Sequence, residues 1–269
     1  MDSWPGQYCI NVTDIERTIA FYEAIGLSNT SRTEIPQALE AIITEPGGKG
    51  GKIQLAQQVE NHAPIDFGHA FWKLYILTND IHRVHAAAVA AGAEVVSAPA
   101  ALDRWPVTVS FVRDPDGYQI EFVQQDPWPD GDSKTLAWVG QYCIYVSDIE
   151  RTIEFYETLG LTLASRTEID HAYEVVLDNP ERAGNRVQLA QQKQPTGPID
   201  MGSAMWKLYF LTDDCVALYE KLVGAGYPGL IEPVRLERWP TTMAFVADPD
   251  GYQIELVQVH GDPDAAKSV

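Results

Sequence analysis

The chain has 269 residues, a formal net charge of −19 and a pI of about 4.5. This acidity argues against a nucleic-acid partner, because few basic groups are present to neutralise phosphates. The sequence contains no run of about 18 apolar residues, so it predicts no membrane-spanning helix and no membrane partner. The first residues do not have the pattern of a signal peptide, and the three cysteines are odd in number. We therefore expect a cytoplasmic protein without a disulfide framework.

A repeat of a whole domain organises the chain. Residues 114–121 read DPDGYQIE, and the same eight letters return at residues 248–255. Adding 134 to a residue number in the first half gives its equivalent in the second half without a gap. The segment between the halves is rich in Pro, Gly and Asp, which is typical of a linker. We predict two domains at residues 1–125 and 140–260, with a linker at 126–139 and a tail at 261–269.

Within each domain the pattern divides again into two similar modules. In the first module Asp14 is the expected cap of a helix that ends at Gly26, and in the second Asp80 and Gly92 have these roles. Alternating apolar residues predict strands at 7–12, 28–35, 39–44, 52–57, 72–78, near 95, at 107–112 and at 118–123. Each domain therefore has the order βαβββ-βαβββ. This order predicts an α+β fold with helices on one side of curved mixed sheets.

Three features resemble the vicinal oxygen chelate superfamily: the paired βαβββ modules, the DIERTIAFYE segment at residues 14–23 and the closing DPDGYQIE turn. That superfamily includes glyoxalase I, extradiol dioxygenases and the bleomycin and fosfomycin resistance proteins. The resemblance implies that each pair of modules curls into an eight-stranded cup. The cups of tandem members either close within one domain or exchange modules, and the sequence leaves both arrangements open. Exchange would bring Gln7 and Gln54 to face Lys207 and Glu255.

The resemblance also implies four inward side chains that hold a divalent metal. Their positions fall on Gln7, Gln54, Lys73 and Glu121 in the first domain, and on Gln141, Gln188, Lys207 and Glu255 in the second. An ammonium group has no lone pair to offer a metal, and its charge repels a cation. We therefore predict that the usual metal site is lost in both domains, and that the protein needs no metal and no other cofactor.

The Lys and Glu side chains at these positions are expected to pair, since a buried charge needs compensation. Two interpretations of the pair stay open. The pair either replaces the metal as a structural link, or it is catalytic. In the catalytic interpretation Glu121 and Glu255 are bases, while Lys73 and Lys207 hold a carbonyl or enolate oxygen.

Further polar side chains are candidates for substrate contacts. Strand alternation places Cys9, Tyr75, Cys143 and Tyr209 on the face of the four ligand positions. The cysteines lack a repeated His as base, so the alternative of a small core residue is favoured over a nucleophile. A repeated Arg-Trp-Pro segment resembles the lid of a glyoxalase-like cup, where Trp stacks on a ligand and Arg anchors an anion. The alternative is a cluster that covers the sheet edge. The residues concerned are Arg104, Trp105, Arg238 and Trp239.

Two classes of function follow from these residues. The first is a glyoxalase-like lyase or isomerase that moves a proton on a small carbonyl or aromatic compound without the usual metal. The second is a protein that sequesters a small molecule, as the bleomycin-resistance branch of the superfamily does. An extradiol dioxygenase is disfavoured, because its iron needs two His and one Glu. The polar lining favours the enzyme, and we expect a monomer or homodimer whose partner is a small molecule.

Overall fold

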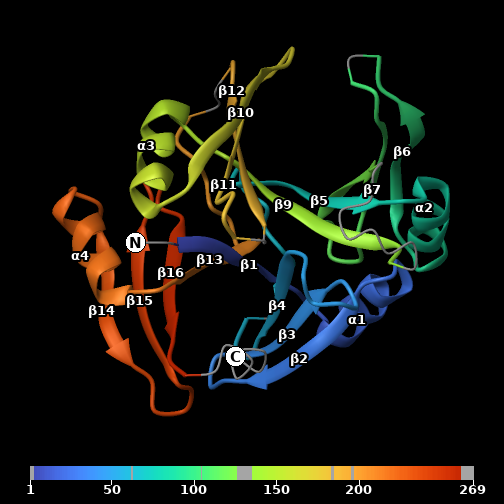
Figure 1. Ribbon diagram of the computed structural model, residues 1–269. Helices are drawn as coiled ribbons and strands as arrows, with labels where there is room; N and C mark the ends of the chain where they lie inside the picture. The colour runs from blue at the N-terminus through green and yellow to red at the C-terminus, as the bar shows by residue number, and fades with distance from the viewer. Residues whose placement is uncertain are drawn as a thin grey trace.

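A computed structural model describes residues 3–61, 63–103, 105–125, 135–182, 185–194 and 197–261. Arg104, residues 126–134 of the expected linker and residues 262–269 of the expected tail lie outside the described residues. Within them the chain forms four βαβββ modules (Figure 1). The first two modules contain β1 (Ser3–Asn11), α1 (Ile15–Ala24), β2 (Ser28–Glu34), β3 (Ala38–Thr44), β4 (Lys52–Gln58), β5 (Phe71–Thr78), α2 (Ile81–Ala90), β6 (Glu94–Ala101), β7 (Thr108–Arg113) and β8 (Gln119–Gln124). The last two contain β9 (Ala137–Tyr145), α3 (Ile149–Leu159), β10 (Thr162–Glu168), β11 (Ala172–Asp178), β12 (Arg186–Gln192), β13 (Met205–Thr212), α4 (Cys215–Gly224), β14 (Gly229–Arg235), β15 (Thr241–Ala247) and β16 (Gln253–Val259).

The helix boundaries follow the capping signals in the sequence. Asp14 and Asp80 each precede a helix and accept a hydrogen bond from the backbone N–H three residues later. The expected stops at Gly26 and Gly92 adopt positive φ angles of 97° and 96°, which only glycine reaches without strain. The same signals recur in the second half, so α4 begins and ends at the positions equivalent to those of α2, and α3 begins at the position equivalent to that of α1 but ends one residue later.

The modules combine into two eight-stranded sheets, and each sheet takes one module from either half of the chain. The first sheet has the order β14-β15-β16-β13-β1-β4-β3-β2, and the second has the order β10-β11-β12-β9-β5-β8-β7-β6. We name the first sheet cup A and the second cup B. The exchanged arrangement is therefore the one observed, because β1 pairs with β13 and β5 pairs with β9. The boundaries 1–125 and 140–260 remain a prediction about the sequence repeat, and the two cups do not follow them.

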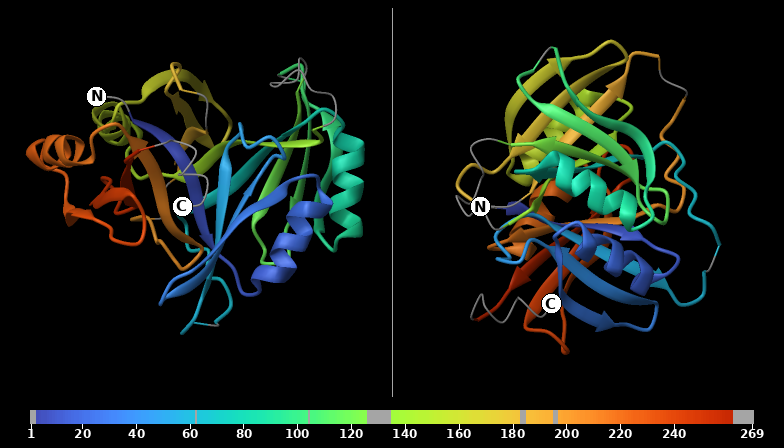
Figure 2. Two further views of the ribbon diagram at one scale, coloured as in Figure 1. Left: turned by 60° about the horizontal axis from the view of Figure 1, so that its bottom comes forward. Right: turned by 90° about the vertical axis from the view of Figure 1, so that its right-hand side faces the viewer.

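The main hydrophobic core lies behind the sheets and leaves their concave faces to form the cups. Helices α1 and α4 pack on the outside of cup A, and α2 and α3 pack on the outside of cup B (Figures 1 and 2). The alternation of β1 shows this division: Tyr8 and Ile10 belong to the core, whereas Gln7 and Cys9 face the cup. Tyr8 stacks on its repeat equivalent Tyr142, with ring centroids 4.7 Å apart.

Equivalent residues of the two halves also meet elsewhere between the cups. Gly51 packs against Asn185, which is its equivalent at the offset of 134. A Cβ atom on Gly51 would lie 1.2 Å from Asn185 Oδ1, so the side chain of Asn185 fills the space that a side chain at position 51 would need. Asn185 is itself buried and donates a hydrogen bond to the carbonyl of Gly6 at 3.4 Å. This contact is asymmetric, although the backbone around it is repeated.

Candidate functional site

A buried lysine–glutamate ion pair lies on the floor of each cup. The Nζ atom of Lys207 on β13 lies 2.6 Å from Glu255 Oε2 on β16, and both side chains are 11% exposed. In cup B, Lys73 Nζ on β5 lies 2.7 Å from Glu121 Oε2 on β8, with side chains 9% and 10% exposed. Each pair joins neighbouring parallel strands at the centre of its sheet. Solvent therefore screens these two ion pairs little.

The surroundings keep each lysine protonated. Burial is the largest single effect on Lys207 and opposes its charged form, but Glu255, Cys9 and Glu40 together raise the pKa of Lys207 above its ordinary value. The pKa of Lys73 is raised in the same way by Glu121, against the opposing effect of burial. Aromatic rings support both cations. Lys73 Nζ lies 3.9 Å from the centroid of the Trp72 ring, and Lys207 Nζ lies 4.5 Å from that of Trp206. Both lysines are thus suited to donate hydrogen bonds to an oxygen rather than to accept a proton.

Two glutamines and a cysteine form a hydrogen-bonded layer beside each ion pair. In cup A the Gln54 carbonyl oxygen accepts hydrogen bonds from Gln7 Nε2 at 3.3 Å and from the Cys9 thiol at 2.8 Å. The layer in cup B is the same: Gln188 accepts from Gln141 at 2.8 Å and from Cys143 at 3.0 Å. The three side chains of each layer belong to one module, and the exchange of modules places each layer beside the ion pair from the other half of the chain.

The two cysteines of the predicted site are more deeply buried than the ion pairs, whereas Tyr75 is half-buried and Tyr209 is as buried as Glu255. Cys9 and Cys143 are fully buried, and burial raises the pKa of both thiols, which disfavours a thiolate nucleophile. The pKa values of Tyr75 and Tyr209 are likewise raised, first by burial and then by the nearby Glu121 and Glu255. Direct contact of these four side chains with a substrate stays a prediction.

One acidic residue in each cup was missed by the sequence reasoning. Glu174 on β11 accepts a hydrogen bond from Gln188 Nε2 at 3.0 Å, and Glu40 on β3 bonds to Gln54 in the same way. Ile42 pairs with Gln54 in the sheet, so Glu40, two residues away, lies on the same face as Gln54. This strand alternation would have identified both glutamates.

Three of the predicted lid residues lie in turns at the sheet edges: Trp105 between β6 and β7, and Arg238 and Trp239 between β14 and β15. Arg238, in the turn between β14 and β15, donates a hydrogen bond to the backbone carbonyl of Glu34 at 2.9 Å. Its guanidinium carbon also lies 4.7 Å from the centroid of the Trp239 ring. Trp105 in cup B is 39% exposed, and its neighbour Arg104 is outside the described residues. The lid function of these residues stays a prediction.

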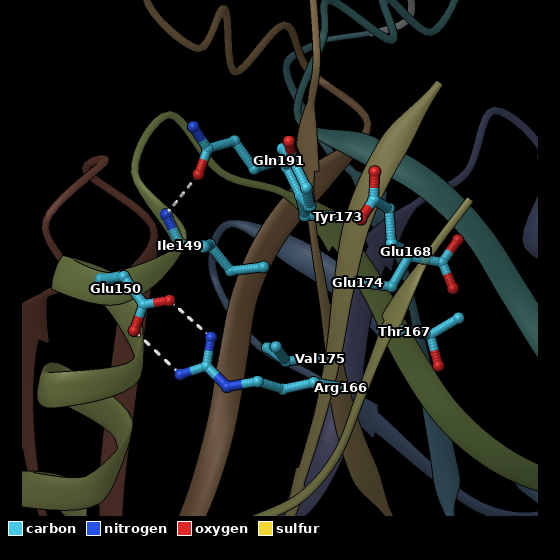
Figure 3. A pocket seen from close by; sticks show the side chains of 9 residues that line it. All are labelled: Ile149, Glu150, Arg166, Thr167, Glu168, Tyr173, Glu174, Val175 and Gln191. Carbon is cyan, nitrogen blue, oxygen red and sulfur yellow. Dashed lines mark hydrogen bonds and ion pairs between the residues drawn. The ribbon is translucent and has the colours of Figure 1, made fainter. Parts of the chain in front are cut away.

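A separate hollow lies between the start of α3 and strands β10 and β11 of cup B (Figure 3). It has a volume of about 530 Å³, and the Glu150–Arg166 ion pair forms one side of it. Ile149 and Val175 give it an apolar lining, and Glu174 also borders it. None of the site residues predicted from the sequence lines this hollow.

The donor set of each cup does not fit a divalent metal. Two neutral amides, one ammonium and one carboxylate occupy the four positions, and the ammonium already pairs with the carboxylate. Two unit charges of the same sign at 4 Å repel by about 4 kcal/mol at an effective dielectric constant of 20, and a divalent ion doubles this. Among the described residues no group of three or more His, Cys, Asp or Glu side chains is arranged to hold a metal.

Comparison with known proteins agrees with the fold described above. The family model of the Glyoxalase/Bleomycin resistance protein/Dioxygenase superfamily matches residues 4–122 and 138–256. The chain belongs to this superfamily. The two matched segments correspond to the sequence repeat, and the tandem α+β fold with two eight-stranded sheets is that of glyoxalase I.

Relatives that match most of the chain include proteins named lactoylglutathione lyase. A lactoylglutathione lyase of Arabidopsis thaliana is 27% identical over 256 residues, which cover 91% of this chain and 88% of the relative. One from Oryza sativa subsp. japonica is 24% identical, with coverage of 91% of this chain and 86% of the relative. The crystal structure of glyoxalase I from Zea mays superimposes with a TM-score of 0.84 at 22% identity, covering 96% of this chain and 92% of that one. The chain is thus a glyoxalase-like member of the superfamily. In the part of the chain that the structure describes, no helix is long and apolar enough to span a membrane.

Proposed function

We propose that the protein is a glyoxalase-like lyase or isomerase that moves protons on a small carbonyl compound, with a Lys–Glu pair in place of a metal. The observation that carries this proposal is the buried ion pair on the floor of both cups. A carboxylate and an ammonium held 2.6 Å apart are the two groups that deprotonation next to a carbonyl requires.

The two members of each pair have different tasks. Glu255 takes a proton from the carbon next to the carbonyl, and negative charge then develops on the carbonyl oxygen. Lys207 donates a hydrogen bond to that oxygen, and its charge stabilises the enolate in a site that is largely shielded from water. Glu121 and Lys73 do the same in cup B. Because each lysine remains protonated, the glutamate is the base.

The names of the relatives suggest the first substrates to test. Lactoylglutathione is a thioester, and its lyase separates it into a thiol and a 2-oxoaldehyde. An adduct of a thiol with a 2-oxoaldehyde carries the required proton on a carbon next to a carbonyl. We therefore place adducts of this class, and simpler 2-hydroxy carbonyl compounds, first among substrates.

Deuterium incorporation tests the proposed proton transfer even when the product is unidentified. The protein is incubated in D₂O with mixtures of 2-oxoaldehydes and thiols, and exchange at carbon is followed by NMR. We expect exchange that depends on the protein and is lost in the double variant Glu121→Gln/Glu255→Gln. Absence of exchange across the panel, despite saturable binding, would refute the enzyme and favour sequestration.

Sequestration is the second candidate because cup B has an aromatic wall. Trp72 stacks on Tyr145 with centroids 5.4 Å apart, next to the cation of Lys73. Such a surface suits a planar ligand. Under this function the protein protects a planar compound from reaction, and the Glu121→Gln/Glu255→Gln variant retains that protection.

Metal analysis provides a further test, because the ammonium groups occupy the place of a cation. We expect purified protein to hold well under one equivalent of nickel, zinc, iron or manganese by elemental analysis. A chelator should leave its melting temperature unchanged. Stoichiometric metal that is lost in the Glu121→Gln/Glu255→Gln variant would contradict the proposal.

A further inference from the structure

We propose that Glu40 in cup A and Glu174 in cup B are the second acid–base groups of the two sites and transfer protons to and from the reacting oxygens. This inference rests on the proposed function, and it divides the work between two carboxyl groups in each cup. Glu255 and Glu121 act on carbon, whereas Glu40 and Glu174 act on oxygen.

The first observation is a chain of hydrogen bonds that aims an amide at each of these glutamates. The Gln188 carbonyl oxygen already accepts from Gln141 at 2.8 Å and from Cys143 at 3.0 Å. This arrangement fixes the amide, so that its Nε2 atom points to Glu174 Oε2 at 3.0 Å. Gln54 makes the corresponding contacts in cup A. The chain of bonds gives the thiol and the two amides of each cup a common role, which is to position the glutamate.

The second observation is that both glutamates face the ion pairs from the opposite module. Glu40 interacts electrostatically with Lys207 and Glu255, and Glu174 interacts with Lys73 and Glu121. The module exchange is what brings them together, since Glu40 and Lys207 come from opposite halves of the chain. Each cup thus holds two carboxyl groups around one ammonium.

The two carboxyl groups of a cup have unlike surroundings. The pKa of Glu40 is raised, mainly by partial burial and also by the nearby Glu255 carboxylate. Lys207, the hydrogen bond from Gln54 and Arg238 lower this pKa but do not cancel the increase. The pKa of Glu174 is also raised, by burial and Glu121 against Lys73, Gln188 and His171. Glu255 and Glu121, by contrast, each have an ammonium in direct contact. Carboxyl groups that differ in this way can divide acid and base roles.

The proton transfers balance without any further reactant. Glu255 removes the proton from carbon while protonated Glu40 gives its proton to the carbonyl oxygen, which forms an enediol. Glu40 then takes the proton from the neighbouring hydroxyl, and Glu255 returns its proton to the adjacent carbon. Both carboxyl groups end in their initial states, and the substrate has isomerised without oxidation or reduction.

The test compares the double variant Glu40→Gln/Glu174→Gln with the wild type. A glutamine retains the size and the hydrogen-bonding capacity of the glutamate, but it transfers no proton. We expect turnover to fall about a hundredfold and the alkaline limb of the kcat/KM profile to disappear. The matched control is Glu23→Gln/Glu157→Gln, which changes two exposed and equivalent glutamates on α1 and α3. This control should leave the turnover and the pH profile unchanged.

A second measurement is independent of activity. Carbon-13 NMR of the glutamate carboxyl groups should show Glu40 and Glu174 titrating above the exposed glutamates, and Lys207→Met should raise the pKa of Glu40 further. Wild-type turnover and pH profile in the glutamine double variant, or ordinary titration of both groups, would overturn the inference. A wild type that exchanges no deuterium defeats the proposed function itself, and the acid–base assignment with it.

Discussion

Cup A and cup B have the same floor but different walls. In cup A the side chain of Arg238 reaches the carbonyl of Glu34, which joins the turn between β14 and β15 to the end of β2. Strands β14 and β2 are the opposite edges of one sheet, so the bond connects the two sides of the mouth. In cup B the corresponding edge strands are β10 and β6, and Glu168 at the end of β10 pairs with Lys193.

The walls of the two cups differ at one pair of equivalent positions. Tyr145 stacks on Trp72 in cup B, whereas its equivalent Asn11 donates a hydrogen bond to the carbonyl of Ser203 in cup A. The ion pairs, by contrast, have nearly equal lengths of 2.6 and 2.7 Å. The repeat has thus kept the charged groups and varied what surrounds them. We therefore expect the cups to share their chemistry and to differ in selectivity.

Breaking an ion pair on the shared floor should have the strongest effect. Lys73→Met leaves Glu121 buried without its cation, which should lower the free energy of unfolding by about 3–5 kcal/mol. The double change Lys73→Met/Glu121→Gln removes both charges and should restore most of this loss, while turnover in cup B falls at least about a hundredfold. In cup A, Lys207→Met should destabilise the protein as Lys73→Met does, and Lys207→Met/Glu255→Gln should restore most of the stability as the double change in cup B does.

Chemical denaturation and deuterium exchange measure the two effects separately. A double variant that is stable, binds ligand and retains full turnover would assign the pair a structural role only. Unequal losses of stability in the two cups would show that the floors are not equivalent.

An effect of comparable size concerns the pH dependence of the DPDG turns near the ends of the two repeats. Burial raises the pKa of both Asp114 and Asp248 to about 7 from an ordinary value of 3.8. The folded protein therefore binds protons more tightly than the unfolded chain. The contribution of these groups to stability should be greatest below about pH 4 and fall by about 1.4 kcal/mol per group and pH unit up to about pH 7.

The two turns should differ in this dependence. Asp114 Oδ2 accepts a hydrogen bond from Tyr22 at 3.1 Å, whereas among the described residues Asp248 Oδ2 has no such donor. Asp248→Asn should stabilise the protein at pH 8 and flatten the curve, more so than Asp114→Asn. Urea unfolding at pH 5.5 and pH 8 checks this, with the exposed Asp103→Asn as control. Equal stability of the wild type at both pH values would contradict the prediction.

At the mouth of cup A the expected change is smaller still. Arg238→Ala removes one hydrogen bond between the two sheet edges, which contributes about 0.5–1.5 kcal/mol. Hydrogen exchange should become faster at the turn after Glu34 and at the turn after Arg235, while cup B stays unchanged. The exposed Arg235→Ala serves as control. Unchanged exchange at both turns would show that the bond does not hold the mouth together.

Much of the arrangement followed from the family resemblance together with strand alternation. The resemblance placed Lys73 and Glu121 among the inward positions, alternation added the side chains on the same face, and the rule that buried charges pair predicted the contact of Lys73 with Glu121. Glu40 was overlooked because it lies in a short, largely apolar strand, although the same alternation includes it. The helix boundaries followed from Asp14 and its equivalents, since a cap acts through contacts within four residues.

The pairing of modules could not be predicted in the same way. Because the repeat makes module one equivalent to module three, and module two to module four, β1 finds similar partner residues on β5 and on β13. The local sequence pattern of each module is the same whether the cups close within one domain or exchange modules. Contacts far apart in sequence accompany the observed arrangement, such as the stacking of Tyr8 on Tyr142.

The contact between Gly51 and Asn185 bears on the history of the chain. Two identical halves would place either two asparagines or two glycines at this point, and the first pair would collide while the second would leave a gap. The present halves fit because one lacks the side chain that fills the space of the other. Neither half could therefore be replaced by a copy of the other without a collision or a gap at this contact.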